Sequence, residues 1–325
     1  MSKLIGVFVD ADPRVKANYG GWFIEITPWL KLLRRQGHRL VWVCPRRFPH
    51  PFERGCYPAF RELFDAVLVD DLRDVDLLYL PCYTGGDARW VYAAVSDCLA
   101  QRKIVVADES DGYLGLIERF GRARGFRVIA RYQYAIPAKD TAYIPWPYHA
   151  DLEPACGVPP KSRDFIFLGN EYGRGRRIAP YLASIGELRP LVIGRWDGML
   201  RTRLASASVR FRKPDYRHRS ALIASARCTI NIVRRSLKHL GLVPSRVPDS
   251  IALGTLVLSE AYGNVADFLP RRDVFKNPSE FSARVKEIAS LSELDYRKRI
   301  EECRRHIRKF ASMERFEDLF LSRFM

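Results

Sequence analysis

The sequence predicts an α/β protein of two consecutive domains, each a parallel β-sheet covered by helices, followed by a helical carboxyl-terminal tail. At 325 residues the chain is about twice as long as a typical domain. Short apolar runs rich in β-branched residues alternate with segments of helical periodicity along most of the chain. A proline-rich stretch interrupts this alternation near the middle, which indicates a junction between two domains.

The first domain is predicted over residues 1–150, where apolar runs have the length and composition of buried strands. Between them lie helical segments such as 23–36, whose apolar residues recur on one face and which stops at Gly37. Strands that alternate with helices favour a parallel sheet with right-handed crossovers. The expected strands are 3–10, 38–45, 65–71, 75–81, 103–110 and 126–132.

The second domain is predicted over residues 151–325. The stretch before and across its start, 144–164, contains five prolines and therefore cannot form one regular element. Beyond residue 280 the apolar residues recur with helical periodicity, which predicts the helical tail. The strand pattern restarts at 164–170, 188–196, 209–213, 228–233 and 254–260.

Positive charge is concentrated in the second half of the chain. The net charge is +17; residues 1–150 hold 21 basic and 17 acidic residues (+4), whereas residues 151–325 hold 33 and 20 (+13). Such a field favours polyanions, anionic cofactors or an acidic membrane surface as partners. Residues 297–309 contain seven basic and two acidic side chains, which fits either a solvated helix face or a footprint for nucleic acid or anionic lipid.

The cysteines are scattered and never form a C-x-x-C pair, so they predict neither a disulfide framework nor a zinc site. This usage fits a reducing compartment, and we expect a cytoplasmic protein. No apolar stretch approaches the ~20 residues that a transmembrane helix needs, so no transmembrane segment is expected. The seven cysteines are Cys44, Cys56, Cys82, Cys98, Cys156, Cys228 and Cys303.

The segment LGNEYGRGRR at 168–177 combines three glycines with three arginines directly after the first predicted strand of the second domain. In open α/β sheets, ligands bind at the carboxyl ends of the strands. Glycine lets the backbone approach an anion, a helix start adds partial positive charge, and guanidinium groups match phosphate oxygens. The segment is neither a P-loop nor a G-x-G-x-x-G fingerprint. It indicates a diphosphate site, and the alternative is a glycine-rich turn with surface arginines.

The segment SRVPDSIALGTLVLSE at 245–260 predicts a short helix over 247–253, because proline suits the first helical turn and glycine the position after the last. At the start of this helix, Asp249 offers a carboxylate for two hydroxyl hydrogen bonds, each worth about 1.5–3 kcal/mol. Arg246 is placed to neutralise a phosphate or to pair with Asp249. Taken alone, the segment also fits a carboxylate favoured by the helix dipole and an exposed salt bridge.

The order of these motifs resembles that of GT-B fold glycosyltransferases. NYGGWFIEITPWLKLLRRQGHRLVWV is similar to their opening glycine loop, helix and second strand. DFIFLGNEYGRGRR, NIVRRSLKHLGLVPSRVPDSIALGTLVLSE and ASMERFEDLF are similar to the carboxyl-terminal half of the spore-maturation-like and group 1 glycosyltransferases. The resemblance implies two facing Rossmann-like domains, with a nucleotide sugar on the second domain and the acceptor mainly on the first.

The resemblance also implies a donor site. In the family, a carboxylate holds the ribose hydroxyls, basic residues after the first strand of the second domain hold the diphosphate, and a glycine loop lies near the transferred sugar. The family usually has glutamate where this chain has Asp249, and its second glutamate would fall on Gly241, so the contact to the donor sugar stays open. The expected donor-binding residues are Gly20, Gly21, Gly169, Arg174, Arg176, Arg177, Arg246 and Asp249.

An inverting transfer needs a catalytic base, which we expect in the first domain, whereas a retaining transfer needs none. Asp12 and Asp111 are preferred, although both also fit helix or turn caps. Residues 10–12 resemble the metal-binding D-x-D of GT-A enzymes, but the two complete α/β halves argue against that class, so neither a metal nor another cofactor is expected. His149 fits a cleft residue or a packed histidine. The candidate bases are Asp10, Asp12, Asp108, Glu109 and Asp111.

These features predict a glycosyltransferase that moves a sugar from a nucleoside diphosphate sugar to an acceptor hydroxyl. The charge favours a polyanionic acceptor, and DNA with hydroxymethylated bases, as in phages, is the first candidate. A glycan, protein or lipid-linked acceptor is the alternative. A non-enzymatic nucleic-acid-binding protein on a Rossmann-like scaffold is a further alternative, with the basic and aromatic residues of 210–219 as its binding stripe.

Overall fold

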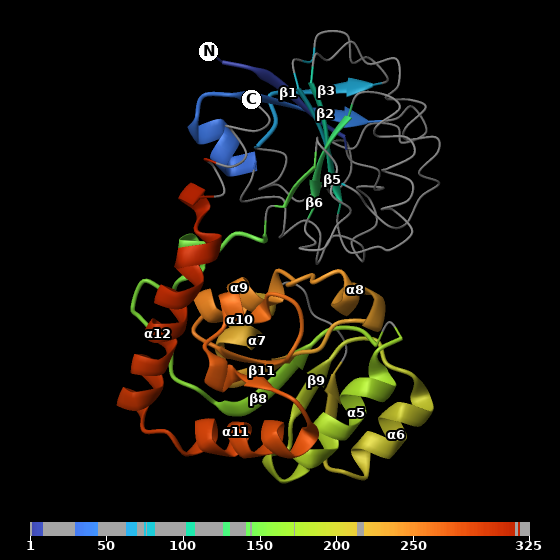
Figure 1. The fold of residues 1–325 in the computed structure, drawn as a ribbon, viewed down its shortest axis with the longest axis vertical. Coiled ribbons are helices and arrows are strands. Elements are labelled where there is room, and N and C mark those ends of the chain that lie inside the picture. Colours follow the sequence, from blue (N-terminus) through green and yellow to red (C-terminus); the bar gives the residue numbers. More distant parts are fainter. Residues whose placement is uncertain are drawn as a thin grey trace. The chain divides into compact units, whose positions relative to one another are not determined.

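The chain forms two compact units, drawn in Figure 1 from a computed structural model. One unit comprises Met1–Arg131, Ala135–Ile144 and Phe320–Met325, and the other comprises Tyr132–Tyr134 and Pro145–Leu319. The main division therefore lies inside the proline-rich stretch. The structure describes residues 2–8, 30–44, 63–69, 75, 77–81, 102–107, 126–130, 141–143, 145–171, 173–212, 218–315 and 318.

The first unit is built on a seven-stranded parallel sheet in the order β3-β2-β1-β4-β5-β6-β7. The predicted strands are present, and β7 is an additional strand that no apolar run marks. The helical residues 30–35 bury Leu30 and Leu33, and the turn that follows places Gly37 at a φ of +82°, which favours glycine. The strands are β1 (Leu4–Phe8), β2 (Arg39–Cys44), β3 (Ala66–Val69), β4 (Leu77–Pro81), β5 (Arg102–Ala107), β6 (Phe126–Ala130) and β7 (Thr141–Tyr143).

The second unit contains a six-stranded parallel sheet in the order β10-β9-β8-β11-β12-β13. The predicted strands form, and β13 is a two-residue addition. The chain extends the sheet from β8 in one direction through β9 and β10, and then returns to β11 on the other side of β8. The carboxyl ends of β8 and β11 therefore form a topological switch point, where α/β sheets bind ligands. The strands are β8 (Arg163–Leu168), β9 (Leu191–Ile193), β10 (Arg210–Arg212), β11 (Ala226–Asn231), β12 (Leu256–Glu260) and β13 (Val274–Phe275).

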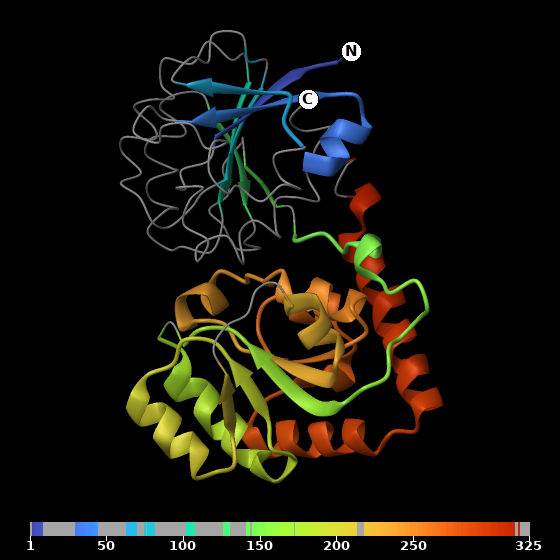
Figure 2. The ribbon, with the colours of Figure 1, turned by 180° about the vertical axis from the view of Figure 1, so that it is seen from behind.

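Helices cover both faces of this second sheet (Figures 1 and 2). They are α5 (Gly175–Ser184), α6 (Gly198–Ala205), α7 (Arg219–Ala224), α8 (Arg235–His239), α9 (Arg246–Ala252), α10 (Val265–Phe268), α11 (Pro278–Ser290) and α12 (Glu293–Ala311), with 3-10 turns η3 (Ala150–Leu152), η4 (Gly186–Leu188) and η5 (Arg271–Asp273). α5 packs against α11, where the rings of Tyr181, Phe275 and Phe281 meet at centroid distances of 5.1–5.7 Å. α9 packs on β11 and β12 and against α12.

α12 is the longest described helix of the predicted helical tail, and it holds α9 in place. The hydroxyl of Tyr296 lies 2.8 Å from the carbonyl oxygen of Gly254, the residue that ends the turn after α9. Arg304, which is 3% exposed, donates to the carbonyl oxygens of Ile251 and Ala252 at 3.4 and 2.7 Å. A guanidinium group at the carboxyl end of a helix satisfies carbonyls that have no intrahelical partner and complements the helix dipole.

Candidate functional site

Two arginines from distant parts of the second unit converge on Gly169, the first residue after β8. A Cβ atom at Gly169 would lie 2.9 Å from Nη2 of Arg174 and 3.1 Å from Nη2 of Arg246. A methyl group there would require the two guanidinium groups and the ring of Phe167 to shift. The two nitrogens are therefore within about 6 Å of each other, where two unit charges repel by roughly 3 kcal/mol at an effective dielectric of 20. An anion that contacted both guanidinium groups would be attracted by each of them.

Both guanidinium groups lie over the same aromatic ring. The Cζ atoms of Arg174 and Arg246 lie 5.6 and 5.1 Å from the ring centroid of Phe167, the penultimate residue of β8. The ring is buried and is itself held edge-on by Trp196, at a centroid distance of 5.9 Å. Cation–π contacts of this kind are worth about 0.5–2 kcal/mol. Because Phe167 belongs to β8, the sheet fixes where the two positive charges lie relative to the end of that strand.

Backbone contacts fix Arg174 further and add positive potential beside it. Its Nε donates to the carbonyl of Asn170 and its Nη1 to that of Ile232, both at 3.2 Å, so it bridges the loops after β8 and β11. Arg174 is also the residue before α5, and Gly173 ahead of it has a φ of +70°. The first N–H groups of α5, with the helix dipole, favour negative charge at the same place.

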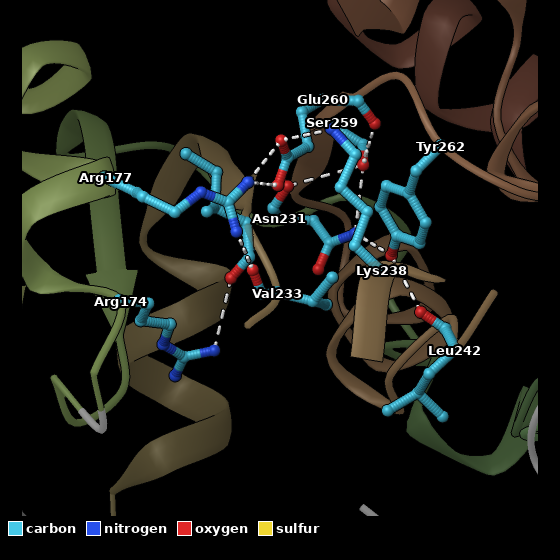
Figure 3. A network of polar contacts seen from close by, with 10 residues as sticks. Arg174, Arg177, Asn231, Val233, Lys238, Leu242, Ser259, Glu260 and Tyr262 are labelled. Carbon is cyan, nitrogen blue, oxygen red and sulfur yellow. Dashed lines mark hydrogen bonds and ion pairs between the residues drawn. The ribbon is translucent and has the colours of Figure 1, made fainter. Parts of the chain in front are cut away.

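Arg177, in the first turn of α5, has a carboxylate partner of its own (Figure 3). Its Nη2 lies 2.6 Å from both oxygens of Glu260, and its Nη1 donates to the carbonyl of Val233 at 2.6 Å. Lys238 reaches the same carboxylate from the other side at 2.9 Å. Glu260 is 6% exposed, so the two cations compensate a largely buried charge. Arg176, between Arg174 and Arg177, is exposed.

A buried polar network lies beside this ion pair and joins the ends of β11 and β12 by side-chain hydrogen bonds (Figure 3). The amide nitrogen of Asn231 donates to Ser259 Oγ at 2.9 Å and contacts the hydroxyl of Tyr262 at 3.0 Å. Tyr262 in turn donates to the carbonyl of Leu242 at 2.9 Å. Oδ1 of Asn231 is buried and has no hydrogen-bond partner among the described residues. Within the described part of the chain it is therefore an unsatisfied acceptor at the end of β11.

Asp249 is buried in the first turn of α9, three residues after Arg246. Burial raises the pKa of its carboxyl to about 6, and the positive charge of Arg219 on α7 opposes that rise. Nη2 of Arg219 lies 3.5 Å from Oδ2 of Asp249. Because residues three apart share a helix face, α9 presents Arg246 and Asp249 side by side. A cation and a carboxylate one turn apart suit a ligand in which a phosphate adjoins a diol.

The local prediction for this segment is confirmed by the structure. The helix spans Arg246–Ala252, one residue earlier than predicted at each end, with Pro248 in its first turn. Gly254 follows with a φ of +82°. The ion pair of Asp249, however, is made by Arg219, which sequence reasoning missed. In the sequence, Arg219 stands out only as part of the basic stretch 210–219. No local sequence pattern connects it to Asp249, which is 30 positions away.

Several predicted residues lie outside the described part of the chain. His149 is described; it is buried just before η3 and stays a candidate without an assigned role. Within the described ranges, no three His, Cys, Asp or Glu side chains are grouped as metal ligands, and no helix there is long and apolar enough to cross a membrane. The predicted site residues and candidate bases that lie outside the described ranges are Asp10, Asp12, Gly20, Gly21, Asp108, Glu109 and Asp111.

The fold is shared with known structures along the whole chain. No protein-family model and no curated protein sequence matches the chain. A mutant of BGT from phage T4, in complex with UDP-glucose, has a TM-score of 0.65 at 12% identity, and 99% of each chain is covered. HepE from Anabaena, in complex with UDP and glucose, has a TM-score of 0.65 at 10% identity, with 98% of each chain covered. This chain has the GT-B fold.

A third GT-B structure agrees with this result. AviGT4, a glycosyltransferase involved in avilamycin A biosynthesis, has a TM-score of 0.61 at 14% identity, and the match covers 98% of this chain and 96% of that one. The predicted fold class is confirmed: the GT-B chain consists of two Rossmann-like α/β domains with a helical carboxyl-terminal region. In this GT-B fold, the residues around Gly169 lie at the switch point of the second domain.

Proposed function

We propose that this chain is a glycosyltransferase that moves a sugar from a nucleoside diphosphate sugar to an acceptor hydroxyl. The observation that carries the proposal is the convergence of Arg174 and Arg246 on Gly169, with the buried Asp249 one turn along α9. Two cations and a carboxylate in this order complement a diphosphate followed by a ribose. The GT-B fold, shared with structures that hold UDP-glucose or UDP, supports the same assignment.

The diphosphate is assigned to Arg174, Arg246 and the first turn of α5. Two guanidinium groups balance two negative charges, and each donates paired hydrogen bonds to phosphate oxygens. Arg177 has its charge matched by Glu260, so we assign it the role of fixing α5 to β12 rather than direct binding. Arg176 is exposed beside them and is retained as a contact to the distal phosphate or the sugar.

The ribose is assigned to Asp249. An ionised carboxylate accepts hydrogen bonds from two neighbouring hydroxyls, and each such bond to a charged group is worth about 1.5–3 kcal/mol. Arg219 stabilises the ionised form from the other side, at 3.5 Å. Because ligand hydroxyls favour the charged carboxylate, binding should lower the pKa of Asp249 from its value of about 6.

In the proposed reaction, the acceptor oxygen forms a bond to the anomeric carbon of the sugar. The bond from that carbon to the diphosphate oxygen breaks, and the nucleoside diphosphate leaves with the electron pair. Arg174 and Arg246 stabilise the charge that develops on the leaving group, so we propose that no metal is required. The hydroxyl proton goes to a base, for which Asp12 and Asp111 are retained as candidates, and Gly20 and Gly21 are retained as neighbours of the transferred sugar.

For the acceptor we propose a hydroxymethylated base in DNA. The net charge of +13 in residues 151–325 supports a polyanion, and BGT from phage T4 is among the structures that share the fold. Incubation with UDP-glucose and DNA containing or lacking hydroxymethylcytosine, followed by mass spectrometry of the nucleosides, tests it. A glucosylated nucleoside is expected only with the modified DNA. Transfer to a glycan, protein or lipid-linked acceptor instead would replace the DNA proposal and leave the glycosyltransferase intact.

Nucleotide-dependent thermal stabilisation tests the donor site itself. A ligand that binds only the folded state at 100 times its Kd stabilises it by about 2.7 kcal/mol, which is readily measured. We expect one member of a panel of nucleoside diphosphates and their sugars to raise the melting temperature. Arg246→Gln should abolish the rise, whereas Arg297→Gln, an exposed arginine on α12, should keep it. If no nucleotide at millimolar concentration stabilises the wild-type protein, the proposed function is wrong.

A further inference from the structure

Six exposed arginines from consecutive elements of the second unit form what we call the arginine face. All six lie within residues 189–212, a segment that holds a single acidic residue, Asp197, and no lysine. Every one of them is exposed, and none makes an ion pair with a residue that the structure describes. Asp197 is occupied as the cap of α6, where its side chain accepts from Met199 N and Leu200 N. The face consists of Arg189, Arg195, Arg201, Arg203, Arg210 and Arg212.

The secondary structure places these charges on the edge strand of the sheet and on the elements next to it. β10 is the edge strand, and Arg210 and Arg212 lie on the same side of it, about 6.6 Å apart along the strand. The side chain between them, Phe211, is turned to the other side, where Arg201 from α6 covers its ring at 5.5 Å from the centroid. Arg195 follows β9. These positions combine exposed guanidinium groups with a rigid strand.

The arginine face begins at the donor site. The backbone N–H of Arg195 donates to Oδ1 of Asn170 at 2.8 Å, and the N–H of Glu171 donates to the carbonyl of Arg195 at 3.0 Å. The loop after β9 is thus hydrogen-bonded to the loop that contains Gly169. A polyanion on the arginine face would run from β10 toward the residues assigned to the donor.

The basic run at 297–309 is a weaker candidate than its composition predicts. Four of its seven basic side chains are paired with carboxylates of the second unit, two of them deep in the structure. The paired residues are Lys298, Arg299, Arg304 and Arg308, which leaves Arg297, Arg305 and Lys309 exposed without an ion pair among the described residues. Most of the charge of this run therefore stabilises α12, whereas the charge of the arginine face is available to a ligand.

We propose that the arginine face binds the phosphodiester backbone of duplex DNA. Planar guanidinium groups match phosphate oxygens in pairs and are more weakly hydrated than ammonium groups, and the face contains only arginine. Charged residues on an edge strand also prevent pairing between sheets, and this is the competing explanation for Arg210 and Arg212. That explanation does not require charge on α6 or after β9. The inference rests on the proposed function, since DNA is there the acceptor.

Matched triple variants test the proposal. Arg203→Gln, Arg210→Gln and Arg212→Gln remove three charges from the arginine face, and Arg297→Gln, Arg305→Gln and Lys309→Gln remove three from α12. Figures 1 and 2 show α6 and α12 at opposite ends of the second unit. Binding of a fluorescent duplex is followed by anisotropy between about 50 and 200 mM salt, where each lost phosphate contact lowers the slope of log K against log salt by about 0.9.

The arginine-face variant should lose up to about 2.7 in slope and at least about tenfold in affinity, whereas the α12 variant should stay close to wild type. Equal losses in the two variants, or a flat slope for the wild type, would overturn the proposal. Stronger binding to vesicles that contain phosphatidylserine than to the duplex would also overturn it, in favour of a membrane surface. Thermal stabilisation by UDP-glucose should be the same in both variants. This measurement distinguishes an error in the proposed donor site from an error in the proposed DNA-binding surface.

A measurement on the wild-type protein avoids any dependence on folding of the variants. Phenylglyoxal modifies accessible arginines, and peptide mass spectrometry reports each site. Duplex DNA should protect Arg203, Arg210 and Arg212 and should leave Arg297 and Arg305 as reactive as before. Protection confined to α12, or no protection at all under conditions where the duplex is bound, would place the DNA elsewhere and refute the arginine face.

Discussion

Replacing Asp249 by asparagine removes a negative charge while the side chain keeps its size. Asp249 is 4% exposed, and burial raises the pKa of its carboxyl from 3.8 to about 6, although Arg219 opposes the rise. The folded protein therefore holds a proton on this group at pH values where the unfolded chain has released it. Stability falls as the pH rises from about 4 to about 6, and the ionised carboxylate costs folding free energy above that range. A shift of about two pKa units corresponds to about 3 kcal/mol.

Asp249→Asn should consequently be more stable than the wild type near pH 7 in the absence of ligand. Asparagine carries no charge to desolvate, so the gain is at most about 3 kcal/mol, a figure in which the attraction to Arg219 is already included. Urea unfolding at pH 7 and at pH 4 measures the difference. The gain should disappear at the lower pH, because the wild-type carboxyl is then protonated in the folded protein.

The same substitution should weaken donor binding. Losing the charge on an acceptor of two hydroxyl hydrogen bonds should cost about 1.5–3 kcal/mol, or about 10- to 150-fold in Kd. For the wild type, affinity should fall about tenfold from pH 7 to pH 5, because the ionised fraction of a group with a pKa of about 6 falls by that factor. Calorimetry with UDP-glucose measures this, since a terminal phosphate, as in UDP, would itself titrate near pH 6.

An exposed carboxylate provides the matched control. Asp151→Asn in η3 should leave both the affinity and its pH profile unchanged. The reasoning is refuted if Asp249→Asn binds UDP-glucose as tightly as the wild type, or if its affinity keeps the wild-type pH dependence. A variant less stable than the wild type at pH 7 would show that the pair with Arg219 outweighs the cost of burying the charge.

Three further outcomes are expected from the structure. Gly169→Ala places a methyl group 2.9 Å from Nη2 of Arg174, so nucleotide-dependent thermal stabilisation should be lost while the unliganded melting temperature changes little; an unchanged ligand response would remove Gly169 from the site. Chelation of divalent ions with EDTA should leave the rate of sugar transfer unchanged, and loss of activity that added Mg²⁺ restores would contradict the arginine assignment. Tyr296→Phe removes a buried hydroxyl whose single proton is shared between the carbonyl oxygens of Arg227 and Gly254; this should cost about 1–3 kcal/mol in urea unfolding and leave nucleotide affinity unchanged.

Local signals account for what sequence reasoning located correctly. The strands of both sheets follow from short β-branched runs, and the helix that presents Asp249 follows from Pro248 and Gly254, whose backbone preferences act within a few residues. The glycine- and arginine-rich segment of Gly169 follows β8 as predicted, and its role in diphosphate binding stays a prediction. The two strands without such signals, β7 and β13, are three and two residues long and form only because a longer neighbour is available.

The sequence by itself determined the α/β class, the succession of strands and helices and the chemistry present at the end of β8, because each depends on periodicity or on the conformational limits of single residues. Only the tertiary structure decided which charges meet. It paired Arg177 with Glu260 across 83 positions and Asp249 with Arg219 across 30, and it set Arg246 over Phe167. It also neutralised most of the run at 297–309 and left the arginine face exposed. Such pairings depend on the order of the strands in the sheet and on the crossover connections between them, which bring together side chains that no local sequence pattern connects.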